Sequence, residues 1–235
     1  MLIKSLRERV LKANLELVEQ GLVLFTFGNA SAIDRQHGLV AIKPSGVPYE
    51  FLTPEHIVVT DLDGTLLEGG LRPSSDLHTH LEVYKHFQDA EGVVHTHSEF
   101  ATAWAQAARP IPCLGTTHAD YFCGAVPVTR ELKEVEIAND YERNTGLVIA
   151  ETMNALGENS ADSMHAVLVA GHAPFCWGDS VEDAVHTAVV LEYVARMASH
   201  TFNIVVEPKP VSNCLLNKHF LRKHGKNAYY GQGAK

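Results

Sequence analysis

Apolar residues recur every three or four positions in several long segments of the chain, a spacing that predicts amphipathic helices. The expected helices cover residues 2–20, about 76–87, 99–108, about 133–157, 180–200 and 214–224. Gly21 is expected to end the first of them. The segment Thr53-Pro54-Glu55 predicts a further helix start, because Thr is a good N-cap and Pro suits the first helical position.

Shorter runs rich in β-branched residues predict strands. These strands are expected at Leu22–Phe27, Ser31–Asp34, Leu39–Ile42, Ile57–Asp61, Thr65–Glu68, Gly92–Ser98, Ala166–Ala170 and Phe175–Trp177. Turn residues at 35–38 and at Asp63-Gly64 join two pairs of them as hairpins. Because long helices fall between groups of hairpin-joined strands, we expect an α/β fold in which helices cover an antiparallel sheet. No G-x-G-x-x-G turn is present to support a dinucleotide-binding fold.

Composition narrows the class of protein. The chain has 235 residues and a net charge of -9, which argues against a general nucleic-acid binder but allows a small anionic substrate in a locally basic pocket. No linker-like or repeated segment divides it, so residues 1–235 are expected to form a single domain. Four scattered cysteines, no apolar run of membrane-spanning length and an acidic, helical N-terminus predict a cytoplasmic protein without membrane contact.

Three histidines are candidate metal ligands. His95 and His97 are two apart in a predicted strand, so their imidazoles are expected on the same face. His172 follows a glycine where a later strand breaks, and it would complete three nitrogen ligands with an open fourth position, the pattern of catalytic zinc. The alternative is that all three are ordinary buried or loop histidines. Asp76 is either a fourth ligand or the N-cap of the next helix.

Three segments combine small residues with hydrogen-bond donors: Gly28-Asn29, Lys43-Pro44-Ser45-Gly46 and Ser74-Ser75. A phosphate group is bound by backbone amides, hydroxyls and a cation at short range. Lys43 could supply the cation, and the serines could supply the hydroxyls. Each segment alone could equally be an ordinary turn or helix cap, but together they favour a phosphate site.

Six motifs, in this order along nearly the whole chain, resemble those of the L-ribulose-5-phosphate 4-epimerases, a family within the class II aldolase and epimerase superfamily. They are Gly28-Asn29-Ala30-Ser31, Lys43-Pro44-Ser45-Gly46-Val47, Arg72-Pro73-Ser74-Ser75-Asp76, His95-Thr96-His97-Ser98, the segment from Gly115 to Phe122, and Lys223-His224-Gly225 with Ala228-Tyr229-Tyr230-Gly231-Gln232. The resemblance implies a three-layer α/β/α sandwich with a central, mainly antiparallel sheet. It also implies homotetramers whose C-terminal tails contribute to the active sites of neighbouring subunits.

The same resemblance assigns roles to individual residues. It implies one Zn²⁺ per subunit on His95, His97 and His172, with Asp76 as a ligand or beside the metal. It implies that the substrate phosphate is bound by Asn29, Lys43, Ser45, Gly46, Ser74 and Ser75. Asp120 and Tyr230 are the implied acid/base pair, and Thr116 and His219 are expected near the substrate.

The implied reaction interconverts L-ribulose 5-phosphate and D-xylulose 5-phosphate at C4, in arabinose or ascorbate catabolism. Breaking and remaking the C3–C4 bond is easier than direct inversion, because the electrons flow into the C2 carbonyl and zinc stabilises the resulting charge. Phe27 and Ala173 depart from the Trp and Gly expected in relatives, and both lie beside the predicted site. The alternatives are a class II sugar-phosphate aldolase, where Glu is usual in place of Asp76, and a non-enzymatic module like the adducin head.

Overall fold

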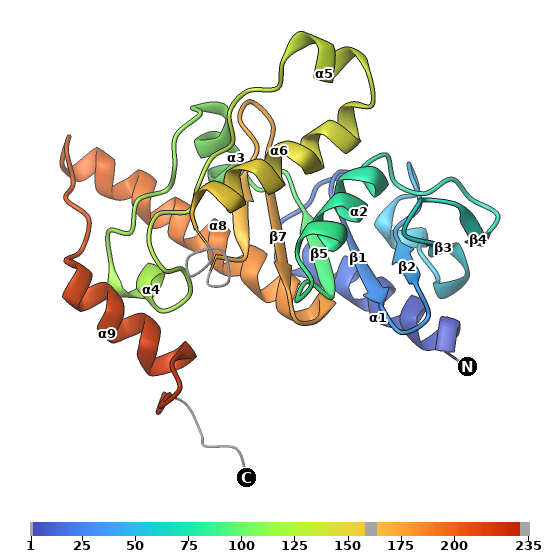
Figure 1. The fold of residues 1–235 in the computed structure, drawn as a ribbon, viewed down its shortest axis with the longest axis horizontal. Helices are drawn as coiled ribbons and strands as arrows, with labels where there is room; N and C mark the ends of the chain where they lie inside the picture. The colour runs from blue at the N-terminus through green and yellow to red at the C-terminus, as the bar shows by residue number, and fades with distance from the viewer. Residues whose placement is uncertain (1, 158–163, 231–235) are drawn as a thin grey trace.

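The computed structural model describes residues 2–157 and 164–230 (Figure 1). Its helices are α1 (Leu2–Glu19), α2 (Leu77–His86), α3 (Glu99–Gln106), α4 (Thr116–Ala119), α5 (Glu134–Ala138), α6 (Tyr141–Ala155), α8 (Val181–Ile204) and α9 (Asn213–His224), with short 3-10 helices at Tyr49–Phe51 and Pro54–His56. Its strands are β1 (Asn29–Asp34), β2 (Leu39–Ile42), β3 (Val58–Thr60), β4 (Leu66–Glu68), β5 (Gly92–His95), β6 (Ala166–Leu168) and β7 (Pro174–Gly178).

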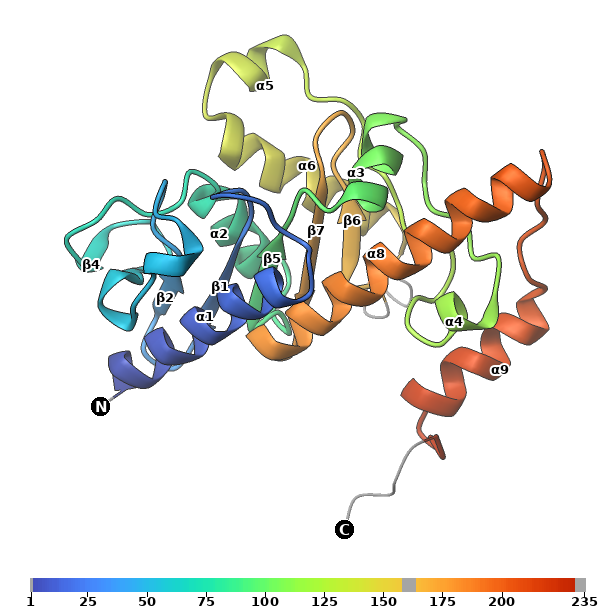
Figure 2. The ribbon, with the colours of Figure 1, turned by 180° about the vertical axis from the view of Figure 1, so that it is seen from behind.

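These strands form one sheet in the order β4-β3-β2-β1-β5-β7-β6, and every neighbouring pair is antiparallel. Helices α2 and α6 pack together on one face of the sheet, whereas α1 and α8 cover the other face (Figures 1 and 2). The predicted three-layer α/β/α sandwich with an antiparallel sheet is therefore confirmed. Both predicted hairpins, β1–β2 and β3–β4, are also present.

Strand β5 lies near the middle of the sheet and is fully buried. A side chain at Gly92 would collide with the backbone of Val181 at the start of α8, so glycine permits the strand and the helix to meet directly. Val93 and Val94 then fill the core on opposite sides of the sheet. The strand ends at His95, at the same end of the sheet as the candidate site described below.

Two predicted elements are wrong. Residues 22–27 do not form a strand, because both sides of β1 are already paired with β2 and β5, and the chain reverses through a turn closed by the Phe27 amide and the Leu24 carbonyl. The predicted helix over 133–157 is two helices, α5 and α6. The chain turns between them at Asp140, whose backbone is in the left-handed region with φ of 50°.

Helices α1, α2, α3, α8 and α9 agree with the expected ones to within a few residues at each end, with α8 extending to Ile204, whereas the short α4 was not predicted. The helix predicted to begin at Thr53-Pro54-Glu55 is a short 3-10 helix with Pro54 at its first position. Gly231 and Gln232 of the last motif lie outside the described residues. Among the helices of residues 2–157 and 164–230, none is long and apolar enough to cross a membrane.

Candidate functional site

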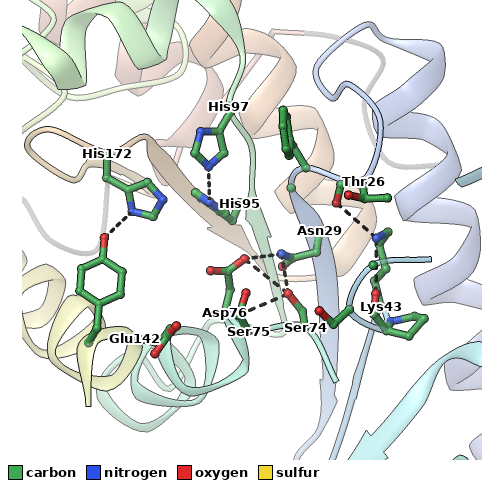
Figure 3. Close-up of a pocket in the computed structure, with 16 residues that line it drawn as sticks. Thr26, Asn29, Lys43, Ser74, Ser75, Asp76, His95, His97, Glu142 and His172 are labelled. Atoms are coloured by element: carbon green, nitrogen blue, oxygen red, sulfur yellow. Dashed lines mark hydrogen bonds between the residues drawn. The ribbon is translucent and has the colours of Figure 1, made fainter. Parts of the chain in front are cut away.

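A cavity of about 410 Å³ opens at the end of the sheet where β1 begins and β5 ends (Figure 3). Residues from six regions of the sequence converge on it. They are Thr26, Phe27, Gly28, Asn29, Lys43, Pro44, Ser45, Gly46, Ser74, Ser75, Asp76, His95, His97, Tyr141, Glu142 and His172. The cavity thus joins all the predicted phosphate-binding residues to all the predicted metal ligands.

The three predicted histidine ligands converge within this cavity. His95 is the last residue of β5, His97 follows two residues later, and His172 comes from the connection between β6 and β7 (Figure 3). Each offers one ring nitrogen, and these nitrogens all lie within 4.8 Å of one another. The Nε2 atoms of His95 and His97 are 3.1 Å apart. The predicted strand over residues 92–98 is shorter in the structure, because β5 ends at His95. The three imidazoles nevertheless converge, although His97 lies beyond the end of the strand.

The donor set fits a divalent metal ion. The Nδ1–H group of His95 donates to the Pro174 carbonyl oxygen at 3.0 Å, which leaves the Nε2 lone pair directed at the triad. Burial, together with neighbouring imidazoles, lowers the pKa of His97 and lowers the pKa of His172 to about 4. These imidazoles are consequently neutral near pH 7, the state in which histidine binds metals.

Asp76 precedes α2 at the N-cap position, but its side chain caps no amide of the helix. Its Oδ2 instead accepts hydrogen bonds from Asn29 Nδ2 at 2.7 Å and from Ser74 Oγ at 3.4 Å. Burial opposes ionisation, but the imidazoles of His95 and His80 and the Asn29 amide together hold the pKa of this carboxyl below its usual value. Asp76 is thus a carboxylate in the same cavity as the histidines, although it is not one of the three clustered donors.

Lys43 is a buried cation on the opposite side of the cavity from His172 (Figure 3). Its ammonium lies 3.4 Å from the carbonyl oxygens of Thr26 and Pro44 and 4.7 Å from the centre of the Tyr49 ring. In the part of the chain that the structure describes, no carboxylate forms an ion pair with it. Burial lowers the pKa of Lys43 to about 8, an effect partly offset by Asp76.

Backbone contacts hold the phosphate-binding segments together. The Ser45 amide donates to the Arg72 carbonyl, and the Ser74 amide donates to the Lys43 carbonyl, both at 3.0 Å. Gly28 has a φ of 71°, and a side chain there would lie 2.8 Å from the His95 carbonyl oxygen. Only glycine therefore allows the segment that carries Asn29 to lie directly against the end of β5.

The predicted acid/base residues lie elsewhere in the chain, in a cluster between α4 and α9. Asp120 accepts from Arg222 Nη2 at 2.8 Å and from the ring of His219 at 3.0 Å. These hydrogen bonds outweigh burial and lower the pKa of the Asp120 carboxyl. The Tyr230 ring lies 4.7 Å from the Arg222 guanidinium, and Thr116 begins α4. None of these residues lines the histidine cavity of the same chain.

Thr26 was not predicted from the sequence as a site residue, and neither were two further cavity residues, Tyr141 and Glu142. They begin α6 directly after the left-handed Asp140. The Asn139-Asp140 pair is a turn signal that could have indicated the helix boundary, because both side chains tolerate left-handed backbone and compete for local hydrogen bonds. Phe27, one of the two departures noted above, also lines the cavity, with its ring centre 6.1 Å from that of His97.

Comparisons with known proteins show which family and fold the chain resembles. Residues 8–199 match the family model described as "Class II Aldolase and Adducin N-terminal domain". The chain is 54% identical to an L-ribulose-5-phosphate 4-epimerase UlaF of Salmonella paratyphi C (strain RKS4594) over 230 residues, covering 98% of this chain and 100% of that protein. Its fold is similar to that of an L-fuculose 1-phosphate aldolase, with a TM-score of 0.77 and 25% identity over 92% of this chain and 94% of the other. It is also similar to an L-fuculose-1-phosphate aldolase of Thermus thermophilus, with a TM-score of 0.67 and 25% identity over 87% and 99%.

The histidine triad predicts that the purified protein binds about one divalent ion per chain. His97→Asn should lose most of this metal, because it removes one of three converging nitrogens, while the far-ultraviolet circular dichroism stays unchanged. Metal content measured by elemental analysis tests this, with His78→Asn on the exposed side of α2 as the matched control. A His97→Asn protein that retains full metal content would show that the ion, if any, is held elsewhere.

Proposed function

The chain belongs to the family of class II aldolase and adducin N-terminal domains, and we propose that it is a zinc-dependent L-ribulose-5-phosphate 4-epimerase. The observation that carries this proposal is the 54% identity to an epimerase over the whole length of that relative. The cavity supports it, because a buried cation with hydroxyl and amide donors lies in the same space as three converging imidazoles.

The phosphate of the substrate is proposed to bind at the Lys43 side of the cavity. Among the residues that the structure describes, the Lys43 ammonium contacts only two carbonyl oxygens and an aromatic ring, so it can attract an anion without first breaking an ion pair. Ser45, Ser74 and Ser75 add hydroxyl groups, and Asn29 is held by its hydrogen bonds to Ser74 and Asp76. The phosphate contact keeps a cleaved fragment in place and orients the sugar chain toward the histidines.

The metal side of the cavity is proposed to carry the reacting carbons. A zinc ion held by His95, His97 and His172, with Asp76 beside it or bound to it, would supply Lewis-acid stabilisation of the charge that develops when C3–C4 breaks. The fixed tautomer of His95 and the neutral state of His172 prepare these side chains for that ion. Phe27 limits the space above His97, so its size can influence substrate preference.

Asp120 and Tyr230 are proposed to act as the acid/base pair in the site of a neighbouring subunit of a homotetramer. Proton transfer on the two faces of the C4 carbonyl needs two groups on opposite sides. Tyr230 is 58% exposed and, like Asp120 and His219, lies outside the cavity of its own chain, which supports a role across an interface. We also propose that residues 1–235 form one domain and that the enzyme is cytoplasmic, as its four free cysteines suggest.

Two other functions remain as alternatives. A class II aldolase would use the same cavity and release the aldehyde fragment, and the similarity to an L-fuculose 1-phosphate aldolase favours this over unrelated enzymes. A binding module like the adducin head needs neither metal ligands nor a buried cation. The intact histidine triad and Lys43 therefore favour an enzyme over a binding module.

The products formed from L-ribulose 5-phosphate distinguish these functions. Zinc-loaded protein should convert it to D-xylulose 5-phosphate with little free glycolaldehyde phosphate, because the phosphate contact holds the fragment until the bond forms again. Coupled assays for the two products on the same samples measure the ratio, with His97→Asn as the inactive control. Accumulation of free aldehyde in place of D-xylulose 5-phosphate would support the aldolase, and no turnover would support the binding module.

Lys43 should give the reaction a specific dependence on pH. Its lowered pKa means that the ammonium is charged below about pH 8 and becomes neutral above it, so kcat/KM should fall as the pH rises through 8. Lys43→Met should raise KM about 10- to 100-fold at pH 7, as expected for a lost charged hydrogen bond, and should remove this alkaline decrease.

Steady-state kinetics between pH 6.5 and 9.5 measure both effects of Lys43. Asp76 and the Tyr49 phenol are the titratable groups that lie near this ammonium, and Asp76 stays ionised throughout this range. The pKa of Tyr49 is raised by burial, so the phenol stays neutral there. A decrease at pH 8 that persists in Lys43→Met would assign it to another group, and a fall in kcat alone would place Lys43 in the chemical step.

A site shared between subunits should recover activity when two damaged chains are mixed. His97→Asn damages the metal half and Tyr230→Phe damages the acid/base half, so each homotetramer should be nearly inactive. Random co-assembly pairs two intact halves at about one site in four, and activity should recover to roughly a quarter of wild type. Co-expression with two affinity tags and assay of the purified heterotetramers tests this. Heterotetramers that are no more active than their parents would rule out the shared site.

A further inference from the structure

The outer nitrogens of two triad histidines are held in different ways. His95 donates from Nδ1 to a backbone carbonyl of β7, within the sheet. The Nδ1 atom of His172 lies 3.4 Å from the phenol oxygen of Tyr141, a side chain from α6, and its other ring nitrogen faces His95 (Figure 3). The orientation of the third imidazole therefore depends on a residue from a separate helix.

The backbone around His172 fixes the position from which the side chain extends, but it does not fix the rotamer of the imidazole. The connection between β6 and β7 is closed by hydrogen bonds from the Val169 amide to the Ala173 carbonyl and from the His172 amide to the Val169 carbonyl, both at 3.0 Å. His172 is only partly buried, unlike His95. An imidazole on such a tight turn can still rotate about its side-chain bonds, so it needs a partner to hold one rotamer.

Tyr141 is well placed to be this partner because its own backbone is held rigidly. Its carbonyl accepts a hydrogen bond from the Thr145 hydroxyl at 2.9 Å, and the next carbonyl, of Glu142, accepts from Thr79 of α2 at 2.6 Å. The left-handed conformation of Asp140 starts α6 at this point. Because Asp76 lies at the N-terminus of α2, the same contacts fix Tyr141 relative to the other polar groups of the cavity.

The protons of this pair can be assigned from the geometry. If Nε2 of His172 presents its lone pair to a metal, then Nδ1 carries the hydrogen and donates it to the Tyr141 oxygen. The phenol hydrogen is then free to point into the cavity that Tyr141 lines.

We propose that Tyr141 is a positioning residue that fixes the tautomer and rotamer of His172 and thereby sets the metal affinity of the triad. This inference rests on the metal site of the proposed function but not on the identity of the reaction. Because the phenol hydrogen remains available, Tyr141 also offers a hydrogen bond to an oxygen of the bound sugar.

The test is metal affinity in the absence of substrate. Tyr141→Phe removes only the hydroxyl group and should weaken Zn²⁺ binding about 10- to 100-fold, the range for loss of a partner that orients a histidine ligand. Competition with a chromophoric chelator measures this affinity. Tyr193→Phe on the exposed face of α8 is the matched control and should bind Zn²⁺ like the wild type.

A second measurement separates orientation from a general loss of stability. The visible spectrum of Co²⁺-loaded protein reports the ligand geometry, and it should change in Tyr141→Phe while the melting temperature of the metal-free protein stays within about 2 °C of wild type. An unchanged spectrum together with a Zn²⁺ affinity within twofold of wild type would overturn the inference. These results are independent of turnover, so the inference can hold even if the protein proves to be an aldolase. A wild-type protein that binds no divalent ion would overturn the inference together with the proposed metal site.

Discussion

The antiparallel pairing of β1 with β5 is the constraint on which the candidate site depends. Its register places Asn29, the first residue of β1, directly opposite His95, the last residue of β5. Directly opposed residues in such a pair have Cα atoms about 4.5–5.5 Å apart, so this one pairing brings the predicted phosphate side into contact with the predicted metal side. A slip of β1 by one residue would turn Asn29 to the opposite face of the sheet from His95 and separate these functions.

Helix α2 is held against the same strand, β1, by polar contacts. Asn29 bonds to Asp76, and two residues further along the strand Ser31 lies 2.7 Å from both His80 Nδ1 and the Tyr84 hydroxyl. Positions 29 and 31 share one face of a strand, and positions 76, 80 and 84 share one face of a helix. The two periodicities therefore match over this contact, which holds the carboxylate of Asp76 at a fixed place beside the histidines. Hydrogen bonds of this kind favour one alignment, because a shifted alignment would break the contacts that Asn29 and Ser31 make with α2 and leave more polar atoms without partners.

The sequence predicted the parts of this arrangement that follow from local pattern. The helical spacing, the two hairpins and the histidines of the triad are all readable from residue types, and the structure contains them at nearly the expected positions. Residues 22–27 were assigned wrongly because a β-rich composition does not reveal that both edges of β1 are already taken. The break at Asp140 was missed because apolar spacing continues through it, and with it the position of Tyr141 beside His172. The proposed meeting of Asp120, Tyr230 and His219 with a cavity would depend on contacts between subunits, and no local pattern encodes these.

The charged groups of the cavity, Lys43 and Asp76, have few partners of opposite charge among the described residues, and this determines how the cavity can interact with ligands. In a chain of net charge -9, Lys43 is buried without an ion pair among the described residues, and its lowered pKa reflects the free energy that burial of the charge requires. Asp76 is a partly buried carboxylate that, among the described residues, is held by hydrogen bonds from Asn29 and Ser74 rather than by a cation within contact distance. The fold keeps both charges apart and oriented, since Asn29 and Ser74 lie in contact with the carboxylate and the Thr26 and Pro44 carbonyls face the ammonium. Such an arrangement stabilises an anion at one end and a cation at the other more strongly than solvent could, because the surrounding groups need not reorganise when the ligand arrives.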